Sequence, residues 1–108
     1  NEKIEQAIGE LFSGNVWPLK CPHDSAPDIY AIYNPEIEEP GYYADDADED
    51  WAQHMQIHAF TKGNYIGMRK EARKKLRENG FIITGIYTNY EKETGYNHLC
   101  IECYTEEE

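Results

Sequence analysis

The chain has 108 residues and a formal net charge of −11, from 21 acidic and 10 basic side chains. This length predicts a single domain, residues 1–108, whose folding buries roughly two-thirds of the unfolded surface. The acidic excess repels a phosphate backbone, so we expect no sequence-specific binding of nucleic acid. No apolar run approaches the roughly 20 residues of a membrane span, and no signal peptide is evident. We therefore expect a cytosolic protein with no membrane partner.

The first third of the chain predicts a helix followed by a strand. Apolar residues recur at helical spacing over residues 4–12, and Ser13, Gly14 and Asn15 follow as a stop signal. The next twelve residues, VWPLKCPHDSAP, contain three prolines, which predicts an extended loop or an edge strand. The run DIYAIYN is rich in β-formers and predicts a strand that ends at Asn34 and Pro35.

Residues 34–50 form an acidic segment, with eight carboxylates from Glu36 onward. Self-repulsion of these charges predicts a flexible loop. Three of its aspartates repeat the spacing of the first EF-hand ligands, but Trp51 and Ile57 occupy the positions where that loop needs glycine and glutamate. We therefore expect a solvated loop and no EF-hand, which leaves only weak, adventitious calcium binding open.

The second half predicts a strand, a helix and a hairpin. Residues 51–60 alternate between apolar and polar side chains, as in a half-buried strand. A helix over about residues 64–79 is predicted to begin at the N-cap Asn64 and to end at Asn79 and Gly80. Its apolar face is formed by Tyr65, Met68, Ala72 and Leu76. The runs FIITGIYTNY and YNHLCIECY, joined by EKETG, predict a C-terminal β-hairpin with Gly95 at a positive φ. Residues 105–108 are expected to form a frayed tail.

These elements predict an α+β fold. The N-terminal helix and the helix at about residues 64–79 are expected to pack on one face of a mainly antiparallel sheet. The second helix carries six of the 10 basic residues, between Arg69 and Arg77. Their position in its later turns complements the negative end of the helix dipole, so they indicate a solvated face and not a nucleic-acid site.

Metal binding is the main chemical alternative. Cys21, His23, Cys100 and Cys103 could form a small metal- or ligand-binding module, although Cys100 and Cys103 stand three apart on a strand and therefore point to opposite faces. His54 and His58, four apart on a strand, lie about 13 Å from each other and cannot share an ion. Three cysteines, an odd number, do not suit a secreted disulfide framework. No catalytic set can be named, so we expect no enzyme and no cofactor.

The order of four segments resembles a known family. IYAIYNPEIEEPGYYADD, WAQHMQIHAFTKGNY, RKEARKKLRENGF and YEKETGYNHLCIECY, within residues 28–104, are similar in pattern and order to the small tail completion or tail terminator proteins of long-tailed bacteriophages and prophages. None of these pieces is a chemical motif, and VWPLKCPHDSAP is less typical of such proteins. A regulatory protein that mimics nucleic acid by its acidity is a further alternative.

The resemblance implies a structural role without catalytic residues. Such proteins form rings, commonly hexameric, at the head-proximal end of the tail tube, where they complete or terminate the tail and help join it to the head. By this resemblance, the partners of the present protein would be copies of itself, the tail tube protein and head–tail connector proteins. It would meet them first in the host cytoplasm and then in the virion. The residues that the resemblance and the charge pattern mark for interaction are Asp45, Asp46, Asp48, Glu49, Asp50, Arg73, Lys74, Glu91 and Glu93.

Two uses of charge follow for a ring of this kind. The acidic segment is expected to face either the channel through which DNA slides or a basic patch on an adjoining ring. The basic helix is expected to pair with the acidic surface of a neighbouring copy, in a salt-sensitive heterologous contact that can close into a ring.

Overall fold

The computed structural model describes residues 2–35 and 52–106. Within them lie two helices and five strands: α1 (Glu2–Ile8), β1 (Val16–Pro18), β2 (Ile29–Pro35), β3 (Ala52–Thr61), α2 (Tyr65–Glu78), β4 (Ile82–Tyr90) and β5 (Asn97–Glu106). The strands form one sheet in the order β1-β2-β3-β5-β4. β1 runs parallel to β2, and every other neighbouring pair is antiparallel. The fold is α+β with a mainly antiparallel sheet, as the sequence predicts.

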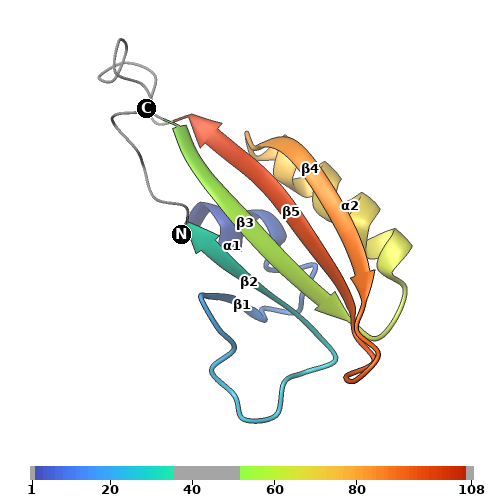
Figure 1. Ribbon diagram of the computed structural model, residues 1–108. Coiled ribbons are helices and arrows are strands. Elements are labelled where there is room, and N and C mark those ends of the chain that lie inside the picture. The colour runs from blue at the N-terminus through green and yellow to red at the C-terminus, as the bar shows by residue number, and fades with distance from the viewer. Residues whose placement is uncertain (1, 36–51, 107–108) are drawn as a thin grey trace, which may run out of the picture.

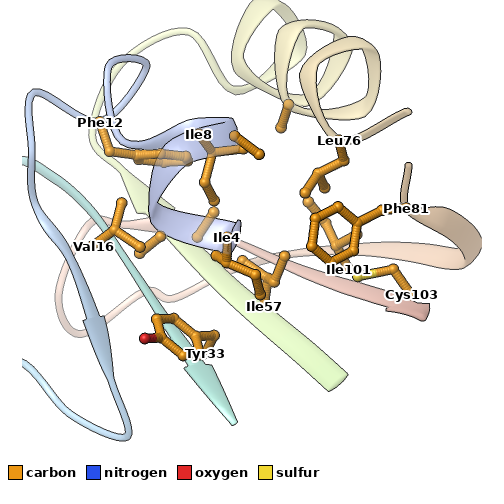
Figure 2. Close-up of a cluster of buried hydrophobic side chains, with 14 of the residues drawn as sticks. Ile4, Ile8, Phe12, Val16, Tyr33, Ile57, Leu76, Phe81, Ile101 and Cys103 are labelled. Carbon is orange, nitrogen blue, oxygen red and sulfur yellow. The ribbon is translucent and has the colours of Figure 1, made fainter. Parts of the chain in front are cut away.

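Both helices pack on the same face of the sheet (Figure 1). We call this the covered face and the opposite side the open face. The core lies between the helices and the covered face, where Figure 2 shows Ile4 and Ile8 of α1 above Ile57 of β3, and Leu76 of α2 near Ile101 of β5. None of the described helices is long and apolar enough to cross a membrane.

Local sequence explains the position of α2. The side chain of Asn64 accepts a hydrogen bond from the backbone N–H of Gly67 at 3.1 Å, which caps the first turn. Met68, Ala72 and Leu76 then recur on one face and are buried against the sheet. Gly80, with a φ of +89°, follows the helix and permits the turn into β4. The predicted start, end and buried face of this helix are confirmed.

The N-terminal helix is shorter than its apolar spacing predicts. It ends at Ile8, and residues 9–14 form turns in which the N–H of Gly14 bonds to the carbonyl of Gly9 at 2.7 Å. Gly14 has a φ of +81°, a conformation that glycine adopts without strain. Phe12 is still fully buried, so its apolar character serves the core through a turn and not through a helix.

A hydrogen bond ties α1 to the sheet. The hydroxyl of Tyr33, which is buried on the covered face of β2, donates to Oε2 of Glu5 at 2.9 Å. Burial and this hydrogen bond raise the pKa of Tyr33 to about 12. The phenol therefore remains the donor throughout the physiological pH range.

Strand boundaries differ from two expectations. β5 continues to Glu106, and Thr105 is buried and accepts a hydrogen bond from Nζ of Lys3 at 3.1 Å. Residues 105 and 106 therefore belong to the sheet, and a tail can begin only after them. β2 ends at Pro35, as predicted, but Asn34 and Pro35 belong to this strand and not to the acidic loop expected over residues 34–50, because both pair with β3. The rest of the acidic segment lies outside the described residues.

The hairpin prediction is confirmed. Residues 91–96 connect β4 and β5, with the N–H of Glu91 bonded to the carbonyl of Tyr96 at 2.8 Å and Gly95 at a φ of +80°. The strand pairing between β4 and β5 is interrupted once, at a bulge between Ile83 and Gly85. The proline-rich stretch supplies β1 as a short edge strand, which matches its predicted extended character.

Candidate assembly surfaces

The open face is more aromatic than the sequence pattern suggests. Alternate residues of β2, β3 and β5 point away from the helices and are all half-buried: Tyr30, Ile32, Asn34, His54, Gln56, His58, Phe60, His98, Cys100, Glu102 and Tyr104. The predicted parity of β3 and β5 is confirmed. The sequence alone favours an exposed polar face at His54 and His58, and this is wrong: both side chains are half-buried, because neighbouring rings cover them in part.

Rings on this face form a ladder across the strands. Phe60 stacks on Tyr30 with centroids 4.7 Å apart and on His98 at 4.4 Å. Tyr96 meets Tyr30 and Phe60 edge-on, and its hydroxyl donates to the carbonyl of Pro27 at 2.6 Å. Trp17 extends the row to β1, 6.2 Å from Tyr30. Each aromatic pair contributes about 0.5–1.5 kcal/mol beyond its buried area, so this aromatic ladder stiffens the open face.

A row of hydrogen-bonded side chains crosses the aromatic ladder. Oε2 of Glu91 lies 3.3 Å from Nδ1 of His98, and Nε2 of His98 lies 2.9 Å from Nδ1 of His58. When both rings are neutral, one assignment satisfies both contacts: His58 donates to His98, and His98 donates to Glu91. Burial, and to a lesser degree the nearby His98, lowers the pKa of His58.

Sequence reasoning missed this pairing. His58 and His98 are separated by 40 positions, and their contact depends on the register in which His58 of β3 stands opposite Cys100 of β5. Alternation along each strand sets His58 apart from Ile57 and His98 apart from Leu99, but it does not show which strands pair. Only the pairing of β3 with β5 shows that they meet.

The cysteines do not support a metal module. Cys103 is buried in the core, whereas Cys100 lies on the open face, as the strand parity predicts. Cys21 and His23 lie in the irregular segment between β1 and β2. No group of three or more metal-ligating side chains occurs among residues 2–35 and 52–106. Burial raises the pKa of Cys103 to about 12 and also raises that of Cys100, which disfavours the thiolates that bind metal.

α2 presents the basic surface. Six basic and two acidic side chains give this helix a net charge of +4, so the remaining residues together carry −15. Arg73 and Lys74, the predicted interaction residues, are exposed on it. Arg73 and Arg77 also line an open hollow of about 340 Å³ between α2 and residues 83–86 of β4.

The acidic residues predicted to make contacts lie in different surroundings. Glu91 is held within the hairpin, because it accepts a hydrogen bond from the hydroxyl of Thr94 at 2.9 Å and also contacts His98. Glu93 is exposed at the turn. Neither residue forms an ion pair with Arg73 or Lys74 in the described part of the chain. Asp45, Asp46, Asp48, Glu49 and Asp50 lie outside the described residues.

Comparisons with known proteins concern the fold of the chain. No protein-family model matches the chain, and no curated protein sequence matches it. Among solved structures, a chain of the particle described as "Virion of native gene transfer agent (GTA) particle" is similar to it, with a TM-score of 0.62 and 11% sequence identity. The match covers 95% of this chain and 90% of that chain. This chain and the virion chain therefore share a fold over nearly their whole lengths.

Proposed function

We propose that this protein is a structural subunit of a phage-like virion. The observation that carries the proposal is the fold shared with a chain of a gene transfer agent particle, which is a phage-like virion, across 95% of this chain. The segment order that resembles tail completion and tail terminator proteins points in the same direction. The described surfaces add charge and aromatic area suited to protein contacts.

Within the virion, we assign the protein to a ring at the head-proximal end of the tail tube. There it completes or terminates the tail and helps join it to the head. Its partners are the tail tube protein, head–tail connector proteins and copies of itself, in a ring that the family resemblance makes hexameric. It assembles in the cytoplasm of the bacterial host and then remains in the virion.

The arrangement of the sheet suits a subunit with contacts at two ends. β2 ends, β3 begins and β5 ends at one end of the sheet, because Pro35 pairs with Met55 and Ala52 pairs with Glu106. The turn at residues 91–95 lies at the opposite end (Figure 1). One end can therefore face the head while the other faces the tube.

The charge distribution suits ring closure. A basic α2 and an acidic remainder are different patches, so each copy can offer one patch to the copy on either side. A net charge of −11 also suits a channel that DNA must traverse without being held.

The test is deletion of the gene from its phage, followed by negative-stain electron microscopy of the lysate. Overlong tails would assign the protein to termination of tail growth. Full heads beside unattached tails of normal length would assign it to the head–tail joint. Intact particles in normal numbers would contradict the proposed function.

A further inference from the structure

Among residues 2–35 and 52–106, no strand pairs with the outer side of β4, which forms one edge of the sheet. It is nine residues long, and its sequence, IITGIYTNY, contains no charged residue and no proline. Ile82, Tyr87 and Tyr90 on this strand are 47%, 59% and 60% exposed. Edge strands are usually short, charged, proline-bearing or covered, because their free N–H and C=O groups otherwise pair with other chains. The opposite edge, β1, has three residues and ends in Pro18, so it has this protection.

The bulge confines the free edge to part of β4. Between Ile83 and Gly85 the register shifts, and a bulge twists an edge away from pairing. From Ile86 to Tyr90 the residues pair one by one with β5. The outer side of this stretch is therefore a regular edge, long enough for an extended segment of about five residues.

A basic strip runs beside this edge. Arg73 and Arg77, one helical turn apart, line the hollow of about 340 Å³ next to the bulge, and Lys70 and Lys74 continue the strip on the outer side of α2. In the described part of the chain, neither arginine has an ion-pair partner. An occupant that matches both features is an extended segment that carries several carboxylates and some apolar side chains.

The chain itself contains a segment of this composition. Residues 36–51 carry eight carboxylates and no basic residue, and they include Ile37, Tyr42, Tyr43 and Trp51. Their charge of −8 complements the +4 of α2. We propose that the β4 edge, together with Arg73 and Arg77, binds residues 36–51 of a second copy.

The contact is heterologous, because the binding edge and the bound segment are different parts of the chain. Repeated from copy to copy, it generates a closed ring when the rotation between copies closes. The inference deepens the proposed function by naming the contact between ring subunits. The contact is nevertheless tested on purified protein, so its failure is separate from that of the virion role.

Two complementary variants test the contact. The edge variant R73E/R77E keeps the acidic segment and reverses the basic strip. The segment variant D45N/D46N/D48N/E49Q/D50N keeps the strip and removes five carboxylates. Because these side chains lie on an exposed helix face or outside the described core, we expect both variants to fold, as verified by circular dichroism. Masses are measured by native mass spectrometry and sedimentation velocity.

We expect the wild type to associate beyond the dimer, more weakly at high salt, and each variant alone to associate about tenfold or more weakly. An equimolar mixture retains one intact pairing, the segment of the edge variant with the edge of the segment variant. The mixture is therefore expected to form a 1:1 heterodimer and nothing larger. A control with the same charge change, K20E/K92E, is expected to associate like the wild type.

Three results would overturn the inference. The first is a wild type that stays monomeric, as it would if the segment bound its own β4. The second is undiminished association of either variant alone. The third is the absence of a heterodimer in the mixture at concentrations where the wild type associates. A second edge test uses Tyr87, whose side chain is exposed: Tyr87→Asp is expected to weaken association more than Tyr87→Lys, and the reverse order would exclude an acidic occupant.

Discussion

The two faces of the sheet are built from the same strands but from different kinds of side chain. On the covered face, Ile57, Leu99 and Ile101 are fully buried beneath the helices. One position away, His58 and Cys100 lie half-buried on the open face. The covered face gains its stability from removal of aliphatic surface from water. The open face is held by ring stacking and by the row of hydrogen-bonded side chains from Glu91 to His58. Aliphatic burial and ring contacts are thus divided between alternate residues of the same strands.

The two faces should differ most in how much a substitution lowers the free energy of unfolding, and two neighbouring residues of β5 allow this comparison. Ile101→Ala removes a fully buried side chain from the core and is expected to lower the free energy of unfolding by about 2–5 kcal/mol. Cys100→Ala, on the open face, is expected to cost less than about 1 kcal/mol. Urea unfolding of both variants at a low protein concentration measures this, because association would otherwise add to the apparent stability. Equal losses would contradict the division between the faces.

The aromatic ladder of the open face is expected to make the next largest contribution to the free energy of unfolding. Phe60→Ala removes the ring that stacks on both Tyr30 and His98, and we expect it to cost about 1–3 kcal/mol. Phe60→Leu keeps an apolar side chain and serves as the control, with a smaller loss. Urea unfolding distinguishes the two. If Phe60→Ala leaves the stability unchanged, the ladder does not hold the open face together.

The bond between Tyr33 and Glu5 tests the polar link to α1 on the covered face. Tyr33→Phe removes the donor and is expected to cost about 0.5–1.5 kcal/mol near neutral pH. Because the pKa of Tyr33 is raised in the folded state, its contribution is complete below about pH 10 and is lost as the pH rises further. Stability measured from neutral to alkaline pH should therefore fall more in the wild type than in the variant. A parallel decline in both proteins would contradict this role.

The smallest expected effect is a pH dependence on the open face. Because burial lowers the pKa of His58, the unfolded chain binds a proton there more readily than the folded protein does. His58 therefore favours folding above about pH 6.5 and loses that contribution as the pH falls below this value. His58→Gln should reduce the fall in urea midpoint between about pH 7 and about pH 5.5. An unchanged fall would show that the pair with His98 does not control it.

Local signals predicted much of the fold. The N-cap Asn64, the apolar spacing of Met68, Ala72 and Leu76, and the glycine at residue 95 each act within a few residues, so their effects could be foreseen. α1 was predicted too long, because its apolar spacing continues to Phe12 while Gly9 and Gly14 favour turns. Spacing reports which residues are buried and does not by itself report whether a helix or a turn buries them.

The surfaces were less predictable because they depend on strand order and register. Alternation along each strand indicates which face His58 and His98 take, but their contact exists only because β3 pairs with β5. In the same way, IITGIYTNY predicts a strand without showing that β4 lies at the edge of the sheet. Arg73 and Lys74 were correctly expected on an exposed helix face, because the helical period is local. Their position beside a free edge could not be deduced from that period.

Cryo-electron microscopy of the head–tail junction of purified phage particles tests the proposed role most directly. We predict a ring of this fold at the head-proximal end of the tail tube, in which the β4 edge and Arg73 of each copy face the neighbouring copy. A particle whose junction and tail contain no subunit of this fold would contradict the virion role. A ring that leaves β4 free would keep that role and exclude the edge contact.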